Sequence, residues 1–186
     1  MGSTRSMLLL AEITRRKYIV DKVSEIREWI KHVSMKREEL GGHAICPYAF
    51  SASVRVEERA LNRVTLIEGA TEDIIIFIVE DDVTLPSMLN KVAELNMKHP
   101  EHVFLDDHKD DPTHIMGIQS NFGKYNMIMC QRNDKLLEAR EKLHETDYYT
   151  YWHQEMYQRI INGKFTNRQE QTVRRIWNDT HNSTIE

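Results

Sequence analysis

The sequence predicts an α+β fold, with a single domain built on a mixed β-sheet. A continuous β-branched and aromatic run at residues 74–79 has the pattern of a strand buried on both faces. The helix pattern after it leads into a second strand pattern at residues 102–106, so the two strands and the helix form a β-α-β unit. One long helix before this unit and two helices near the C-terminus complete the predicted architecture.

Length and composition limit the function classes. A chain of 186 residues can bury a sizeable core, and 40% hydrophobic with 29% charged residues is ordinary for a globular protein. The net charge of -4 provides no basic field, so nucleic acid is not an expected partner, nor is an anionic membrane. The longest apolar run is far shorter than the ~20 residues that cross a bilayer. Two cysteines make no disulfide scaffold, which favours a reducing, cytoplasmic setting.

The chain begins with a long predicted helix. We expect residues 1–16 to be a flexible or expression-derived start, residues 17–163 to be the core and residues 164–186 to be a C-terminal extension. The helix is predicted at residues 18–40, and the glycines at 41 and 42 would end it. Its apolar residues recur at alternating steps of four and three, as Ile19, Val23, Ile26, Ile30 and Val33.

The middle of the chain supplies the β-α-β unit. Short strands are predicted around Val54 and Val56 and at residues 64–67, before the buried strand at 74–79. Thr84 is a suitable N-cap for the next helix, and Pro86 falls in its first turn, where no backbone N–H is needed.

The last third predicts a hairpin and two helices. The hairpin joins residues 115–120 to residues 125–131, with Gly123 in its turn. The first helix covers residues 133–144, with Leu136, Leu137 and Leu143 facing inward. The second covers residues 148–162, and its buried face carries Tyr149, Trp152, Met156 and Ile160.

The segment CPYA, residues 46–49, is the first candidate site. Cys46 would act as a nucleophile or soft metal ligand, with His43 as its base or co-ligand and Tyr48 as a third catalytic residue. The end of a helix gives a thiolate no help from the helix dipole, so either a helix that starts nearby or a cation such as protonated His43 would be needed to lower the pKa of Cys46. The alternative is that Cys46 is a small buried hydrophobic residue and that Pro47 stiffens the loop.

The same segment carries a resemblance. A helix bearing Trp29, followed by Cys46, Pro47, Tyr48 and Ala49, resembles uncharacterised domains of unknown function that share a CPFA-type motif after their first helix. Tyr48 stands where those families more often have phenylalanine. The resemblance implies a fold and the location of a site, and it implies no particular reaction.

The loop LDDHKDDPTH, residues 105–114, is the second candidate site. Asp106, Asp107 and His108, together with Asp82 after the neighbouring predicted strand, offer carboxylate and imidazole ligands for a divalent metal such as iron, manganese or zinc. If the two strands were adjacent, their carboxylates would be crowded unless a cation relieved the repulsion. The alternative is a solvated acidic loop.

Two function classes follow. The first is a small cytoplasmic enzyme of unknown reaction, with a site centred on Cys46 or assisted by a metal, acting on a small-molecule substrate. The alternative is a non-catalytic binding or assembly module that forms a homodimer through the helix at 18–40. The common nucleotide-binding and hydrolase motifs GxxxxGK[ST], GxGxxG and GxSxG do not occur.

Overall fold

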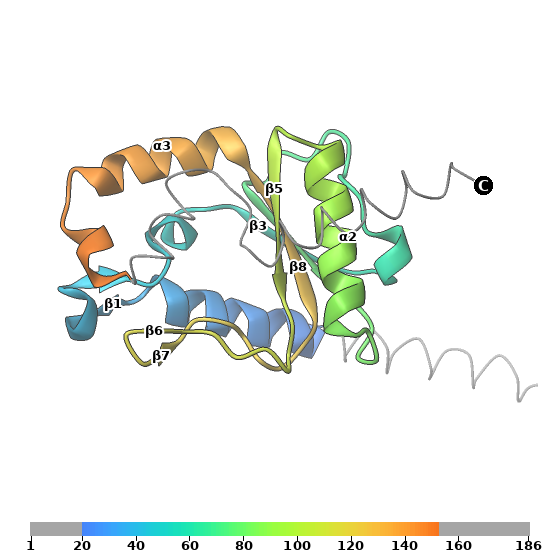
Figure 1. Ribbon diagram of the computed structural model, residues 1–186, viewed down its shortest axis with the longest axis horizontal. Coiled ribbons are helices and arrows are strands. Elements are labelled where there is room, and N and C mark those ends of the chain that lie inside the picture. Colours follow the sequence, from blue (N-terminus) through green and yellow to red (C-terminus); the bar gives the residue numbers. More distant parts are fainter. Residues whose placement is uncertain (1–19, 153–186) are drawn as a thin grey trace, which may run out of the picture.

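A four-stranded mixed sheet forms the centre of the molecule, which confirms the α+β class (Figure 1). The structure is a computed structural model, and it describes residues 20–152. The strands lie in the order β3 (Val54–Glu58), β4 (Ile74–Ile78), β8 (Met127–Arg132) and β5 (His102–Asp107). β3 is parallel to β4, whereas β8 is antiparallel to both of its neighbours.

The predicted β-α-β unit is present, with one difference. β4, α2 (Leu85–Lys98) and β5 follow each other as expected, and the Thr84 side chain accepts a hydrogen bond from the Ser87 amide as an N-cap. β4 and β5 run in the same direction because both are antiparallel to β8. They are not neighbours, however, because β8 is inserted between them.

Each face of the sheet has its own core. Alternate residues of a strand point to opposite faces, so Ile75 and Phe77 pack against α2, with Met88, Val92 and Leu95. On the other face, Ile74, Ile76 and Ile78 pack against Ile26 and Trp29 of the first helix. All five residues of β4 are buried, as a strand covered on both faces requires.

The predicted hairpin is wrong in its pairing. A small hairpin does exist, but it joins β6 (His114–Ile115) to β7 (Ile118–Gln119), and Met116 and Gly117 form its turn with positive φ angles of 50° and 80°. Residues 127–132 instead enter the main sheet as β8. Met127 and Ile128 are fully buried on opposite faces, a burial that pairing with a short surface strand would not provide.

Two other boundaries differ from the predictions. In the described part, the first helix covers residues 20–34 and does not continue to 40. In a longer helix the Val33 carbonyl would accept a hydrogen bond from the Arg37 amide. Instead it accepts one from the Cys46 amide, at 2.8 Å. Residues 64–67, predicted as a strand, pair with none of the described strands and follow the short helix η3 (Leu61–Arg63). The side chain of Val64 is nevertheless buried in the core.

A short β-hairpin replaces the end of the predicted helix. β1 (Lys36–Arg37) pairs with β2 (His43–Ala44), and η1 (Glu38–Leu40) lies between them. Gly41 ends η1 with φ 61°, so the glycine has the predicted capping role on a different helix.

The C-terminal part is confirmed for one helix. α3 covers Asn133–His144, although Leu137 is 49% exposed and does not face inward. Tyr148–Tyr151 form the short helix η4. The rest of the predicted helix at 148–162, with Met156 and Ile160, lies outside the described residues, as do residues 1–16 and the extension at 164–186.

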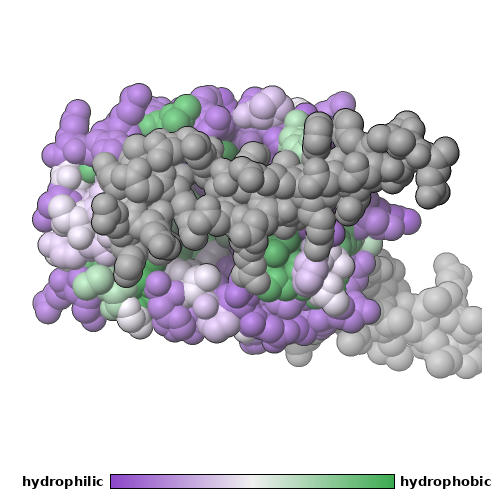
Figure 2. All heavy atoms as spheres, viewed as in Figure 1, coloured by the Kyte–Doolittle hydropathy of each residue, from purple (hydrophilic) through white to green (hydrophobic). Residues whose placement is uncertain are grey.

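The surface of the described part is mainly hydrophilic in the view of Figure 2, with apolar side chains in smaller patches. Phe50, at 82% exposure, and Met116, at 60%, are among the exposed apolar residues. Within residues 20–152, none of the helices has the length and apolarity that crossing a bilayer requires. Two residues of the stripe that predicted dimerisation, Ile26 and Val33, are buried in the chain's own core, and the homodimer stays a prediction.

Candidate functional site

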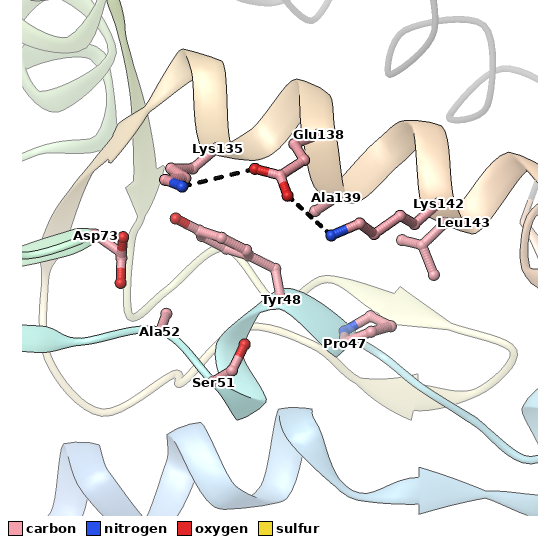
Figure 3. Close-up of a pocket in the computed structure, with 10 residues that line it drawn as sticks. All are labelled: Pro47, Tyr48, Ser51, Ala52, Asp73, Lys135, Glu138, Ala139, Lys142 and Leu143. Atoms are coloured by element: carbon pink, nitrogen blue, oxygen red, sulfur yellow. Dashed lines mark hydrogen bonds and ion pairs between the residues drawn. The ribbon is translucent and has the colours of Figure 1, made fainter.

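A pocket of about 390 Å³ lies between the CPYA segment and α3 (Figure 3). Pro47 and Tyr48, in the short helix η2 (Pro47–Phe50), form one wall of the pocket. The facing wall is α3, which contributes Lys135, Glu138, Ala139, Lys142 and Leu143. Asp73 lies at the end of the pocket, one residue before β4. The volume is within the usual range for small-molecule sites, about 300–1,000 Å³.

Tyr48 places a polar atom in this pocket without a partner. Its hydroxyl oxygen is buried and makes no hydrogen bond with the residues that the structure describes. Figure 3 shows the hydroxyl pointing toward the side chains of Lys135 and Asp73. Burial, followed by the negative charge of Asp73, raises the pKa of Tyr48 to about 12. The phenol therefore stays protonated at neutral pH and acts as a hydrogen-bond donor.

Asp73 is held as a carboxylate. Its Oδ2 accepts hydrogen bonds from the Ser53 amide at 2.9 Å and from the Ser53 hydroxyl at 2.8 Å. These two bonds lower the pKa of Asp73, and the charges of Lys135 and Arg132 lower it further. The pocket thus has a fixed negative charge next to the Tyr48 hydroxyl.

The α3 wall carries both signs of charge. Glu138 is 2.8 Å from the Lys142 ammonium and 3.6 Å from that of Lys135. All three side chains are more than 40% exposed, so these ion pairs add little to stability. Lys135 is therefore free to move its ammonium toward a bound ligand.

Cys46 does not line the pocket, although Pro47 and Tyr48 do. It packs against an aliphatic cluster that includes Val33, Leu40 and Ile45. Burial raises the pKa of the Cys46 thiol, and hydrogen bonding to the Ala49 and Tyr48 amides only partly opposes this. Cys46 is half-buried, and its aliphatic environment matches the alternative of a small packed residue better than that of a nucleophile.

We expect the Cys46 thiol to react slowly with iodoacetamide. In a Cys130→Ala variant, which removes the second thiol, the rate at neutral pH should be at least about tenfold below that of free cysteine, because little thiolate forms. Adding urea should restore the rate. A native rate close to that of free cysteine would contradict the buried assignment and restore Cys46 as a nucleophile.

His43 is directed to another part of the chain. Its Nε2 lies 2.6 Å from Asp147 Oδ1, and its ring packs in a T-shaped contact with Tyr148. Tyr148 also donates a hydrogen bond from its hydroxyl to the Ile45 carbonyl, at 2.7 Å. His43 therefore helps to hold η4 against the β1–β2 hairpin, and it is not part of the pocket wall.

The predicted metal ligands do not converge. Asp106 and Asp107 are consecutive in β5, so their side chains point to opposite faces of the sheet. Asp107 accepts the Phe122 amide at 2.9 Å. His108 donates from Nε2 to the Val83 carbonyl at 2.9 Å and accepts the Asp110 amide at Nδ1, so both ring nitrogens are occupied.

The crowding that suggested a metal is also absent. Because β8 separates β4 from β5, the two strands are about 10 Å apart, and Asp82 is exposed. The buried amide of Asn126 connects the ends of these strands instead, donating to the Glu80 carbonyl and accepting the Lys109 amide. No group of three or more His, Cys, Asp or Glu residues suited to a metal occurs within residues 20–152.

The pocket lies at the opposite end of the sheet from these aspartates. Asp73 precedes β4, whereas Asp82 follows it, and Asp107 ends the strand β5 that runs in the same direction. Cys46 and these aspartates therefore do not line one common pocket. Of the predicted catalytic residues, Tyr48 alone lines the pocket.

Sequence reasoning missed Asp73, Lys135, Glu138 and Lys142. In the sequence, Asp73 is simply the polar residue before a strand, and the three α3 residues have the spacing of an ordinary solvated helix face. The segment around Tyr48 was the available signal, and two of its residues, Pro47 and Tyr48, line the pocket.

Comparison with known proteins found no family model, no curated protein and no solved structure that the chain matches. The resemblance to families with a CPFA-type motif therefore stays a prediction.

Proposed function

We propose that this protein binds a small polar molecule in the pocket between η2 and α3, with Tyr48 as the hydrogen-bond donor to it. The observation that carries the proposal is the Tyr48 hydroxyl, which is buried and has no partner among the described residues. Buried polar groups are nearly always hydrogen-bonded, and leaving one unpaired costs about 1–3 kcal/mol. A ligand acceptor placed at this hydroxyl would remove that cost.

This proposal keeps the CPYA segment as the site and a small molecule as the partner. Tyr48, and not Cys46, is the central residue of the proposed site, because the Cys46 thiol is outside the pocket and its pKa is raised. A neutral phenol with a pKa of about 12 is suited to donating a hydrogen bond, and it is a poor base at neutral pH. Recognition by Tyr48 is thus the first function to test.

We also propose a reducing, cytoplasmic location. Both cysteines, Cys46 and Cys130, are free thiols. Free thiols persist where glutathione and thioredoxin keep cysteines reduced, and this supports the proposal.

The test combines a ligand panel with a single-atom change. Polar metabolites, including amino acids, sugars and small organic acids, are screened for an increase in melting temperature, and binding is then measured by calorimetry. Tyr48→Phe should raise the dissociation constant of a ligand from the panel by about tenfold or more, because the substitution removes one hydrogen bond to that ligand. Its melting temperature should change little, since within residues 20–152 the hydroxyl has no hydrogen-bond partner to lose.

Tyr125→Phe is the matched control. The Tyr125 hydroxyl donates to Glu25 at 2.6 Å and is not part of the pocket wall, so its loss should leave the dissociation constant unchanged. The proposal fails if no panel molecule binds, or if Tyr48→Phe binds as tightly as the parent protein.

A further inference from the structure

We infer that the ligand is a free α-amino acid, bound through its ammonium at Asp73 and through its carboxylate at Tyr48 and Lys135. This inference rests on the proposed function and specifies the ligand class of the same pocket. The geometry behind it is the placement of two opposite charges on either side of one buried hydroxyl (Figure 3).

Asp73 supplies the negative side. Both Ser53 hydrogen bonds go to Oδ2, so Oδ1 accepts none from the described residues. The serine also fixes the orientation of the carboxylate, because the Ser53 hydroxyl lies 2.9 Å from the Asp73 amide as well. A fixed carboxylate with a free oxygen is a suitable acceptor for an ammonium group.

Lys135 supplies the positive side, and the neutral Tyr48 hydroxyl adds a hydrogen-bond donor next to it. The Lys135 ammonium is 3.6 Å from Glu138, beyond ordinary hydrogen-bond length, while Glu138 makes its short contact with Lys142. A further nearby cation, Arg132, is occupied by two hydrogen bonds to Asp134, at 3.1 and 2.6 Å. A ligand carboxylate could therefore accept from the Tyr48 hydroxyl and from Lys135 together.

The charge balance favours a zwitterion over a simple ion. A monocarboxylate would be attracted by Lys135 but repelled by the negative charge of Asp73. A monoamine would be attracted by Asp73 but repelled by Lys135. In an α-amino acid the two charged groups are attached to the same carbon, which matches two opposite charges around one hydroxyl. Each group would then meet its complement.

The other end of the pocket is suited to a side chain. Pro47, Ala139 and Leu143 lie away from Asp73 and offer apolar contact (Figure 3). A pocket of about 390 Å³ has room for an amino acid with an aliphatic or aromatic side chain. We therefore expect leucine or phenylalanine to bind more tightly than glycine.

Calorimetry with leucine and its blocked forms tests the inference. The probes are L-leucine, leucinamide, N-acetyl-leucine, 4-methylpentanoate and 3-methylbutylamine, with phenylalanine and its amide as a second series. We expect each free amino acid to bind at least about tenfold more tightly than every form that lacks one charge. Asp73→Asn and Lys135→Met should each weaken binding of the amino acid by a similar factor.

Lys31→Met is the control, because Lys31 is an exposed lysine that pairs with Glu28 and is not part of the pocket wall; we expect the dissociation constant of the amino acid to stay within about twofold of the parent value. Circular dichroism verifies that each variant is folded. If a blocked or single-charged form binds as tightly as the amino acid and still depends on Tyr48, this inference is wrong and the proposed function stands. The same holds if only a sugar or another uncharged molecule binds. If nothing in the panel binds, both are wrong.

Discussion

Asn126→Ala should lower the free energy of unfolding by about 3 kcal/mol, because it leaves buried hydrogen-bonding groups without partners. Asn126 is 0% exposed. Its side-chain NH2 donates to the Glu80 carbonyl at 3.0 Å, and its side-chain oxygen accepts the Lys109 amide at 3.1 Å. The amide thus connects the loop after β4 to the loop after β5, and alanine would release both. Urea denaturation measures the change.

Two comparisons make this prediction specific. Asn62→Ala removes an exposed asparagine in η3 and should change stability by less than about 0.5 kcal/mol. Asn126→Asp keeps the shape but replaces the NH2 donor with a charge facing carbonyl oxygens, so it should be at least as destabilising as alanine at neutral pH. A loss below about 1 kcal/mol in Asn126→Ala would show that water replaces the amide at little cost.

Asp107→Asn should stabilise the protein at neutral pH. Burial raises the pKa of Asp107 from its ordinary value of 3.8 to about 6, against the opposing hydrogen bonds from the Phe122 and Gly123 amides. The pKa of Asp107 in the folded state is above its value in the unfolded state. The contribution of the protonated carboxyl to folding stability is therefore complete below pH 3.8 and is lost as the pH rises through about 6. The cost of ionising the buried group above that range corresponds to about 3 kcal/mol at most.

The pH profile of stability distinguishes this cause from a general effect. The asparagine oxygen can still accept the Phe122 amide, so the variant should lack the loss of stability that the parent shows between about pH 4 and about pH 7. Asp110→Asn, an exposed carboxyl in the same loop, is the control and should keep the parent profile. If Asp107→Asn instead runs parallel to the parent across this range, Asp107 is not the group that titrates.

The parts of the fold that the sequence predicted are those with strong local signals. The β-branched run gave β4, and Thr84 with Pro86 gave the start of α2, because burial on both faces and helix capping leave local patterns. The position of β8 has no local signal. Its residues alternate between two cores, and only the pairing of distant segments places it between β4 and β5.

Of the candidate pocket, the sequence predicted only the segment around Tyr48. Tyr48 was named, but Asp73 and Lys135 come from segments far apart in the chain, and both look like ordinary surface residues when read singly. Asp107 and His108 show the opposite case. They are chemically suited to a metal, but in the fold their polar atoms bond to backbone groups.

The position of β8 between β4 and β5 also determines when the sheet can close during translation. While the ribosome has released only the residues before 127, β4 has one paired side and β5 has none, so backbone groups that are later internal remain open to water. The nascent chain can form α2, but it cannot close the sheet until β8 emerges and joins β4 to β5. Closure of the four-stranded sheet is therefore coupled to the arrival of a single segment.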